Sequence, residues 1–362
     1  MKEYSNLDFL RALAVTVVTG AHVAEFYVNA LKIIRPLGAV GVNLFFVHTA
    51  LVLMQSLERQ ERDGSRHLFW DFAIRRFFRI YPLATFVTLA VILFHIPSNR
   101  MEVGHLYSMK LSVGSIISNL TLTQGFFALV LTIVAPMWSL SFEVYMYLFL
   151  PALYRLLRYN FAILFAGSLA VSTLLLYYYP YETGWSYLRI FQYVPCFMPG
   201  IMAYWLSKKV TPRFPAYSWV IFLFAVLGIT YSDIAPNWRF FPGWGRWWVP
   251  IVVGFSIPFF KQLTSPTLTK ASKIIARYSY GIYLVHYFCI WAALEKIGHN
   301  HLVLGIMSFC LLLVAIPVVL YHVLEEPLIN FGKRIIQRRF RQPEISTVFL
   351  GSESRPLKNS TL

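Results

Sequence analysis

Arg11, His22 and Glu25 are ionisable side chains within the first apolar stretch of the chain. In a helix, the eleven residues from Arg11 to His22 bring both onto one face, about 20° apart in rotation and about 16 Å apart along the axis. Glu25 follows on that face, close enough to orient or charge the imidazole. A charge at the centre of a membrane helix costs about 2.5–3.5 kcal/mol, so we expect this trio to serve proton transfer at His22. Arg11 alone has a simpler explanation, because long cationic side chains extend toward the membrane interface.

A fourth ionisable group, Glu143, ends the run Trp-Ser-Leu-Ser-Phe-Glu that begins at residue 138. With the N-terminus on the inner side, Glu143 lies at the same bilayer depth as His22, so the two side chains can meet across a helix bundle. A buried carboxylate fixes the tautomer of a neighbouring imidazole and stabilises its cation, which makes the imidazole a general base. The alternative is a polar clamp between two helices, worth about 0.6 kcal/mol in lipid.

The basic loop 58–80 ends in a segment that is amphipathic if it is helical. Arg75, Arg76 and Arg79 then form one cationic patch over an aromatic face. Guanidinium groups bind phosphate through two parallel hydrogen bonds, so the patch suits a phosphorylated ligand from the cytoplasm. Attraction to anionic lipid headgroups explains the same charges equally well.

The composition indicates what kind of structure positions these ionisable side chains. The chain has 362 residues, of which 57% are hydrophobic and 13% are charged, and its mean hydropathy is +0.58. Soluble domains have about 25% charged residues, so we expect a helical membrane protein. The net charge of +16 is explained by the Lys and Arg residues that membrane proteins carry in their cytoplasmic loops. Nucleic-acid binding is therefore not needed to explain it. The three cysteines have no metal-ligand spacing, so no metal site is expected.

The hydropathy pattern predicts an all-α bundle of about ten transmembrane helices. A span needs about 20 mostly apolar residues. The stretches that come closest are 7–28, 40–57, 81–96, 138–157, 161–179, 190–206, 216–231, 247–260, 278–297 and 301–323. A further stretch, about 114–134, is interrupted by Ser, Thr, Asn and Gln. We predict that it forms a re-entrant or hairpin segment instead of crossing.

The distribution of basic residues predicts the orientation of the bundle. With both chain ends on the cytoplasmic side, 24 of the 32 Lys and Arg residues lie inside and 8 lie outside, as the positive-inside rule requires. A full crossing by 114–134 would place the basic C-terminal tail outside. Residues 1–341 therefore form one integral membrane domain, and the polar stretch 342–362 is predicted to be a disordered cytoplasmic tail.

Six short segments together carry a family resemblance. In chain order they are Leu7–Ala12 with His22, Gly41–Val47, Arg76–Pro82, Trp138–Glu143 followed by Tyr147 and Pro151, Ser279–His286, and Glu326 with Pro327. Their order and spacing over almost the whole chain resemble the acyltransferase-3 family of integral membrane acyltransferases. Two positions depart from the family pattern. Asn43 stands where the family often has Asp, and Val144 stands where a second Glu often follows Glu143.

This resemblance implies an acyl-CoA donor, usually acetyl-CoA, and a sugar hydroxyl as acceptor. The acceptor would belong to a cell-surface polysaccharide, a lipopolysaccharide or a lipid-linked glycan precursor, which implies a bacterial inner membrane. Arg75, Arg76, Arg79 and Arg11 would then bind the polyanionic donor. His22, aided by Glu25 or Glu143, would deprotonate the acceptor hydroxyl. A mechanism in which His22 itself is acylated, through a transient acyl-imidazole, is the alternative.

Six further residues are weaker candidates for substrate binding. Asn43, Ser141 and Tyr283 have groups that can donate to a developing oxyanion. His286 is expected to make a core hydrogen bond rather than to act in catalysis. Trp238 and Trp244, in an aromatic outer segment, can stack on acceptor sugars or simply belong to the interfacial aromatic belt.

A transporter or flippase of a lipid-linked saccharide is the alternative function, with His22 and Glu143 as a proton relay. The cytoplasmic Arg cluster is against it, because a proton relay does not need one. The two halves of the chain also lack corresponding broken helices. A non-catalytic assembly subunit is a weaker third option.

Overall fold

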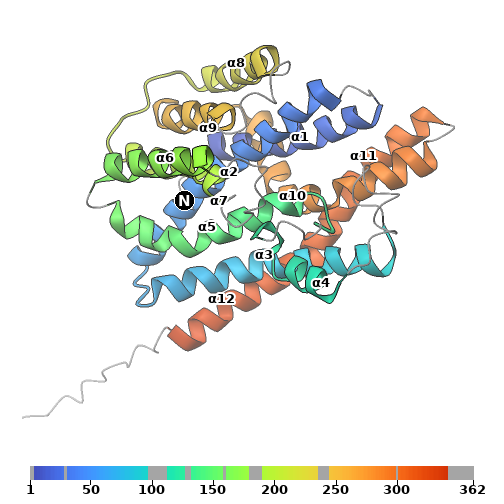
Figure 1. Ribbon diagram of the computed structural model, residues 1–362, viewed down its shortest axis with the longest axis horizontal. Coiled ribbons are helices and arrows are strands. Elements are labelled where there is room, and N and C mark those ends of the chain that lie inside the picture. The colour runs from blue at the N-terminus through green and yellow to red at the C-terminus, as the bar shows by residue number, and fades with distance from the viewer. Residues whose placement is uncertain are drawn as a thin grey trace, which may run out of the picture.

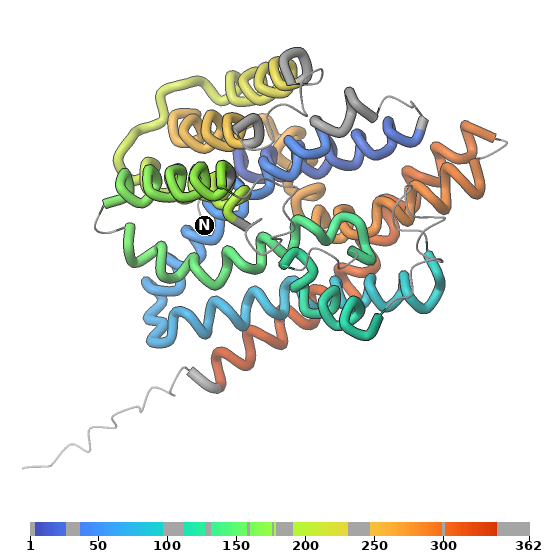
Figure 2. The backbone as a smooth tube through the Cα atoms, viewed as in Figure 1, coloured from blue at the N-terminus to red at the C-terminus, as the bar shows by residue number. Residues whose placement is uncertain are grey.

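A computed structural model of the protein describes residues 4–27, 31–96, 112–126, 132–157, 160–178, 190–234, 244–298 and 301–340. Every regular element in these ranges is a helix (Figures 1 and 2), apart from one isolated β-bridge between Phe214 and Phe260. The predicted all-α class is therefore confirmed. The predicted tail 342–362 lies outside the described residues.

The ten predicted apolar stretches coincide with helices. These are α1 (Ser5–Tyr27), α2 (Leu31–Arg62), α3 (Leu68–Leu93), α5 (Met137–Leu156), α6 (Phe161–Tyr178), α7 (Ile190–Leu206), α8 (Ala216–Ile234), α9 (Trp244–Ser256), α10 (Pro266–Cys289) with the π-helical η6 (Ile290–Ile297), and α11 (Leu302–Leu320). The last continues through the π-helical η7 (Tyr321–Glu325) into α12 (Glu326–Phe340).

Within the described ranges, four helical runs are long and apolar enough to cross a membrane: Ser5–Phe26, Leu37–Arg62, Leu68–Leu93 and Leu302–Arg338. Phe161–Leu175, Ala216–Thr230 and Trp247–Phe259 are shorter apolar helices. The arrangement as ten spans with both ends on the cytoplasmic side remains a prediction.

The basic segment before Tyr81 is part of a long helix. α2 continues to Arg62 and α3 begins at Leu68, so the predicted loop 58–80 is reduced to residues 63–67. The Ser65 hydroxyl donates a hydrogen bond to Asp71 at 2.6 Å, which ties this turn to the start of α3. The helical backbone therefore sets the direction in which each arginine side chain of this segment leaves α3.

The stretch 114–134 folds back on itself. Its described part contains the helix α4 (Val113–Leu120) and the 3₁₀ turn η1 (Gln124–Phe126). The backbone amide of Ile133 donates to Oδ1 of Asn119 at 2.9 Å, which joins the two ends of the segment. A helix of eight residues is about 12 Å long, far short of the roughly 30 Å of a hydrocarbon core.

The helix α2 lies at the centre of the bundle and contacts α1, α5, α7, α8 and α9 (Figure 1). α1 packs between α2 and α10. Small residues allow close crossings: a Cβ added at Gly200 of α7 would lie 2.2 Å from the carbonyl oxygen of Val47 in α2. Membrane helices depend on such close packing, because in lipid the hydrophobic effect does not drive helices together.

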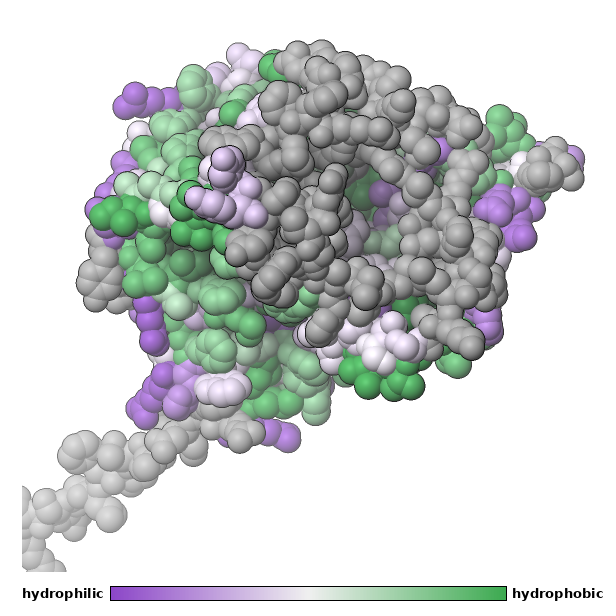
Figure 3. Space-filling model, viewed as in Figure 1, coloured by the Kyte–Doolittle hydropathy of each residue, from purple (hydrophilic) through white to green (hydrophobic). Residues whose placement is uncertain are grey.

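The outer surface of the bundle carries large apolar side chains. On the α11 run, Val303, Leu311 and Val323 expose 72%, 68% and 72% of their surface. Broad apolar areas are also visible among the coloured residues of Figure 3. Apolar area on this scale suits contact with lipid rather than with water.

The crossing of α7 over α2 provides a test of the packing. We expect Gly200→Ala to lower the free energy of unfolding by about 2 kcal/mol, because a backbone carbonyl cannot move aside as a side chain can. Gly167→Ala is the matched control, since a Cβ there meets no atom within 4 Å. Thermal unfolding in detergent measures both, and equal melting temperatures would contradict the assignment of this crossing.

Candidate active site

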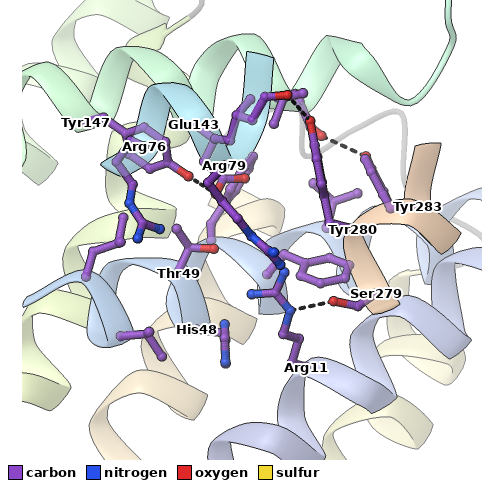
Figure 4. A pocket seen from close by; sticks show the side chains of 18 residues that line it. Arg11, His48, Thr49, Arg76, Arg79, Glu143, Tyr147, Ser279, Tyr280 and Tyr283 are labelled. Carbon is purple, nitrogen blue, oxygen red and sulfur yellow. Dashed lines mark hydrogen bonds between the residues drawn. The ribbon is translucent and has the colours of Figure 1, made fainter. Parts of the chain in front are cut away.

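A polar cavity of about 80 Å³ lies where α1, α2, α3, α5 and α10 meet (Figure 4). Its polar lining is drawn from all five helices: Arg11, His48, Thr49, Arg76, Arg79, Ser139, Glu143, Tyr147, Ser279, Tyr280 and Tyr283. So many ionisable groups at one point inside an apolar bundle indicate a functional site.

Three guanidinium groups converge on this cavity. Nε of Arg11 donates a hydrogen bond to the hydroxyl of Ser279 at 2.5 Å. Arg79 forms an ion pair of 3.1 Å with Glu325 at the end of η7. Arg76 extends past Tyr147 (Figure 4), and in the described part of the chain its buried Nε has no hydrogen-bond partner. Arg11 and Arg79 approach each other and repel electrostatically.

Two carboxylates compensate only part of this positive charge. Glu143 accepts a hydrogen bond from the Tyr147 hydroxyl, lies beside the Thr49 hydroxyl, and attracts Arg11 and Arg76 from a distance. Among the described residues, neither Arg11 nor Arg76 has a carboxylate within ion-pair distance. A buried charge without a close partner is expensive, so the cavity is suited to an anion supplied by a ligand.

The rim toward α10 is held by hydroxyl groups. Tyr283 and Ser139 share a hydrogen bond of 2.7 Å, and Tyr283 also donates to the carbonyl of Pro136 at 3.1 Å. The Tyr280 hydroxyl donates to the carbonyl of Ile80 at 2.7 Å. These bonds join α10 to α5 and α3 and therefore set the width of the cavity.

The imidazole of His22 lies away from the cavity lining and contacts α10. Its ring stacks on His286, with centroids 5.1 Å apart and an interplanar angle of 12°, and its centroid is 4.7 Å from that of Tyr287. Nδ1 of His286 donates to the carbonyl of Tyr283 at 2.8 Å, which leaves Nε2 as an acceptor. The path of contacts from the cavity to His22 therefore passes through Tyr283 and His286.

The structure thus separates groups that the sequence analysis brought together. Glu143 faces Arg11 and Arg76, whereas the described contacts of His22 are with α10. Glu25 follows His22 on α1 and is partly buried. The predicted cationic patch also divides, because Arg76 and Arg79, three residues apart, line the cavity and Arg75 does not.

Asn43, Ser141 and His286 lie outside the cavity lining. Asn43 is buried in α2, and the Ser141 hydroxyl donates to the carbonyl of Trp138 at 2.8 Å. His286 makes the core hydrogen bond that was expected of it. Trp244 begins α9, and Trp238 lies outside the described residues. Nor do the described ranges contain a group of three His, Cys, Asp or Glu side chains positioned for a metal ion.

The sequence analysis did not select several residues of the site, such as Thr49, Ser279 and Tyr280, and it also missed two buried ionisable groups, His48 and Glu325. His48 lines the cavity with 4% of its surface exposed, and its Nδ1 has no hydrogen-bond partner within the described ranges. It is an ionisable residue inside a predicted span, so the rule that identified His22 applies to it as well. Glu325 follows the predicted end of the last span at residue 323, where the apolar pattern gave no reason to expect a buried carboxylate.

Comparisons with known proteins agree on an activity class. The family model described as an acyltransferase domain, Acyl_transf_3, matches residues 4–322. Acyltransferase MdmB of Streptomyces mycarofaciens is 32% identical over 165 residues, which are 42% of this chain and 40% of that protein. A protein of Acidianus two-tailed virus named Putative acetyltransferase ORF330 is 27% identical over 289 residues, covering 76% of this chain and 80% of its own. No solved structure matches the chain significantly.

The ion pair between Arg79 and Glu325 is expected to stabilise the fold. Glu325→Gln leaves a guanidinium without its partner and should lower the free energy of unfolding by about 3 kcal/mol. Adding Arg79→Met removes the orphaned charge, so the double variant should lose less than the sum of the two single losses. Thermal unfolding of the three variants in detergent measures the coupling, and strictly additive losses would contradict a direct pair.

Proposed function

The chain belongs to the acyltransferase-3 family of membrane proteins, and on this premise we propose that it transfers a short acyl group, such as acetyl, from acyl-CoA to a sugar hydroxyl. The observation that carries the proposal is the convergence of Arg11, Arg76 and Arg79 on one cavity whose carboxylates do not match them in charge. A transporter is less well supported, since family membership favours group transfer.

The cavity suits the phosphates of a CoA donor. Guanidinium groups bind phosphate oxygens in a planar, two-pronged geometry, and a cavity with low dielectric strengthens each contact. Arg76 has no competing ion pair among the described residues, so it is available to a ligand without first losing a protein partner. Arg11 retains its bond to Ser279, which holds its side chain in place for the incoming anion.

The imidazole of His22 would act as the general base. It takes the proton of the acceptor hydroxyl as the oxygen attacks the thioester carbonyl. The carbon–sulfur bond breaks, and the proton passes to the departing thiolate, so that the products are the ester and CoA-SH. Because Tyr283 and His286 lie on the contact path, the thioester reaches His22 only if Tyr283 turns aside. Attack by His22 itself, through an acyl-imidazole, leads to the same products.

We further propose that the acceptor is a sugar of a surface polysaccharide, lipopolysaccharide or lipid-linked precursor, and that the protein lies in a bacterial inner membrane. The name of the viral relative supports acetyl as one acyl group. The apolar outer surface supports a position in a membrane, next to lipid-linked acceptors.

Removing the proposed base tests the chemistry. We expect His22→Ala to lower the release of CoA-SH from acetyl-CoA by at least about 100-fold, the usual contribution of general acid–base catalysis. The measurement uses purified protein with a thiol-reactive dye and saccharide acceptors extracted from the membrane. The exposed His301 provides the control, and His301→Ala should behave as wild type. Full activity of a folded His22→Ala variant would exclude the assignment.

Removing a phosphate ligand tests the donor site. Arg76→Ala should raise the KM for acyl-CoA by about tenfold or more, the value of one hydrogen bond to a charged group. Arg76→Lys should recover part of the loss, because it restores the charge without the planar geometry. Arg62→Ala, at the exposed end of α2, is the matched control. A defect confined to the acceptor KM would contradict the assignment.

A further inference from the structure

A second cavity, of about 200 Å³, lies between α3, α10 and α11. Among the described residues its walls are hydrocarbon and aromatic rings, including Val87, Ala90, Leu284, Phe288 and Ile316, and Tyr287 is the one of them with a polar side-chain group. We call this cavity the apolar chamber. The chamber is partly open, since the lining side chain of Phe86 is 49% exposed, and apolar walls of this kind bind hydrocarbon.

The apolar chamber adjoins the proposed base. Tyr287 is part of its wall, and the same ring lies 4.7 Å from the rings of both His22 and His286. One aromatic ring therefore separates the imidazole pair from the hydrocarbon lining. A group bound in the chamber would end within reach of the atoms that react.

Along both α3 and α10, the residues that line the polar cavity are followed in the chain by residues that line the apolar chamber. On α3, Arg76 and Arg79 face the polar cavity, and Val87 and Ala90 face the chamber. On α10, Tyr283 faces the polar cavity and Leu284 and Phe288 face the chamber. At 1.5 Å per residue, about 12 Å separates Arg79 from Val87 along α3. A ligand with an anionic end, a long arm and an apolar end matches this order.

The size of the chamber selects among apolar ligands. Its lining covers residues 86–91 of α3, 284–288 of α10 and 316–320 of α11, about 6–8 Å along each axis, together with Ile96 and Val134. A cavity of about 150 Å³ already holds the six carbons of benzene, so about 200 Å³ fits a chain of about six carbons.

We infer that the apolar chamber binds the acyl chain of the donor, so that the substrate class extends from acetyl to acyl-CoA thioesters of about six carbons. This inference rests on the proposed function, because it places the thioester carbonyl at His22. The chain lies beyond Tyr287 and the CoA phosphates lie in the polar cavity. Binding in the chamber buries methylenes that water surrounds in free acyl-CoA.

A chain-length series with purified protein tests the inference. Each methylene buried from water is worth about fourfold in affinity, so we expect kcat/KM to rise at least tenfold from acetyl-CoA to hexanoyl-CoA and to fall again by decanoyl-CoA. Ala90→Phe fills the chamber and should lower the ratio of hexanoyl to acetyl transfer at least tenfold. Leu89→Phe is the control: its side chain is 40% exposed, lies outside the chamber, and should leave both rates as in wild type.

A second measurement separates binding from chemistry. Hexanoyl-CoA that carries a photoreactive diazirine near the chain end should label α3 between residues 86 and 91 and α10 between residues 284 and 288, and Ala90→Phe should abolish this labelling. A flat chain-length series, or labelling elsewhere, would overturn the inference and leave the proposed acyl transfer standing. Labelling of the chamber without release of CoA-SH from any thioester would overturn the proposed function. It would also overturn the role of the chamber in catalysis.

Discussion

The structure depends on how buried guanidinium groups are compensated inside an apolar bundle. Placing a charge in lipid is costly, and protein partners reduce that cost only when they are close and well oriented. Arg79 has such a partner in Glu325, with an ion pair of 3.1 Å, whereas Arg11 is held by the neutral hydroxyl of Ser279. The positive charge that remains supports the proposed binding of a polyanionic donor.

The same arrangement connects distant parts of the chain. Arg11 lies on the first helix, Arg79 on the third, and Ser279 and Glu325 on the last two long helical runs. Their contacts close the bundle around the polar cavity, so the site exists only when both ends of the chain are assembled. Close crossings, such as the one at Gly200, bring α7 against the central helix α2.

The interior also changes character along its length. α3 lines a cationic cavity first and a hydrocarbon chamber about two turns later, and on α10 the chamber begins at the residue after Tyr283. The paired rings of His22 and His286 lie next to the chamber, because both contact Tyr287. This order matches a molecule of acyl-CoA, which has phosphates at one end and an acyl chain at the other. The polar hydrogen bond between Tyr283 and Ser139 lies on the route between them, so access to the imidazole requires a movement of Tyr283.

The amino-acid sequence alone determined the all-α class, the ten apolar stretches that coincide with helices, the fold-back within residues 114–134 and the acyltransferase family, but not the helical start of α3 at Leu68 or the helix α12. Each of the features that it determined follows from local hydropathy, from charge counts or from short motifs, which do not require knowledge of which helices touch. The tertiary structure decided three further features: which face of α3 enters the cavity, the pairing of Arg79 with Glu325, and the presence of His48 in the site. Bilayer depth can place Glu143 level with His22, but lateral position in the bundle depends on side-chain packing between helices. That packing set Glu143 beside Arg11 and Arg76, and set the ring of His22 against α10.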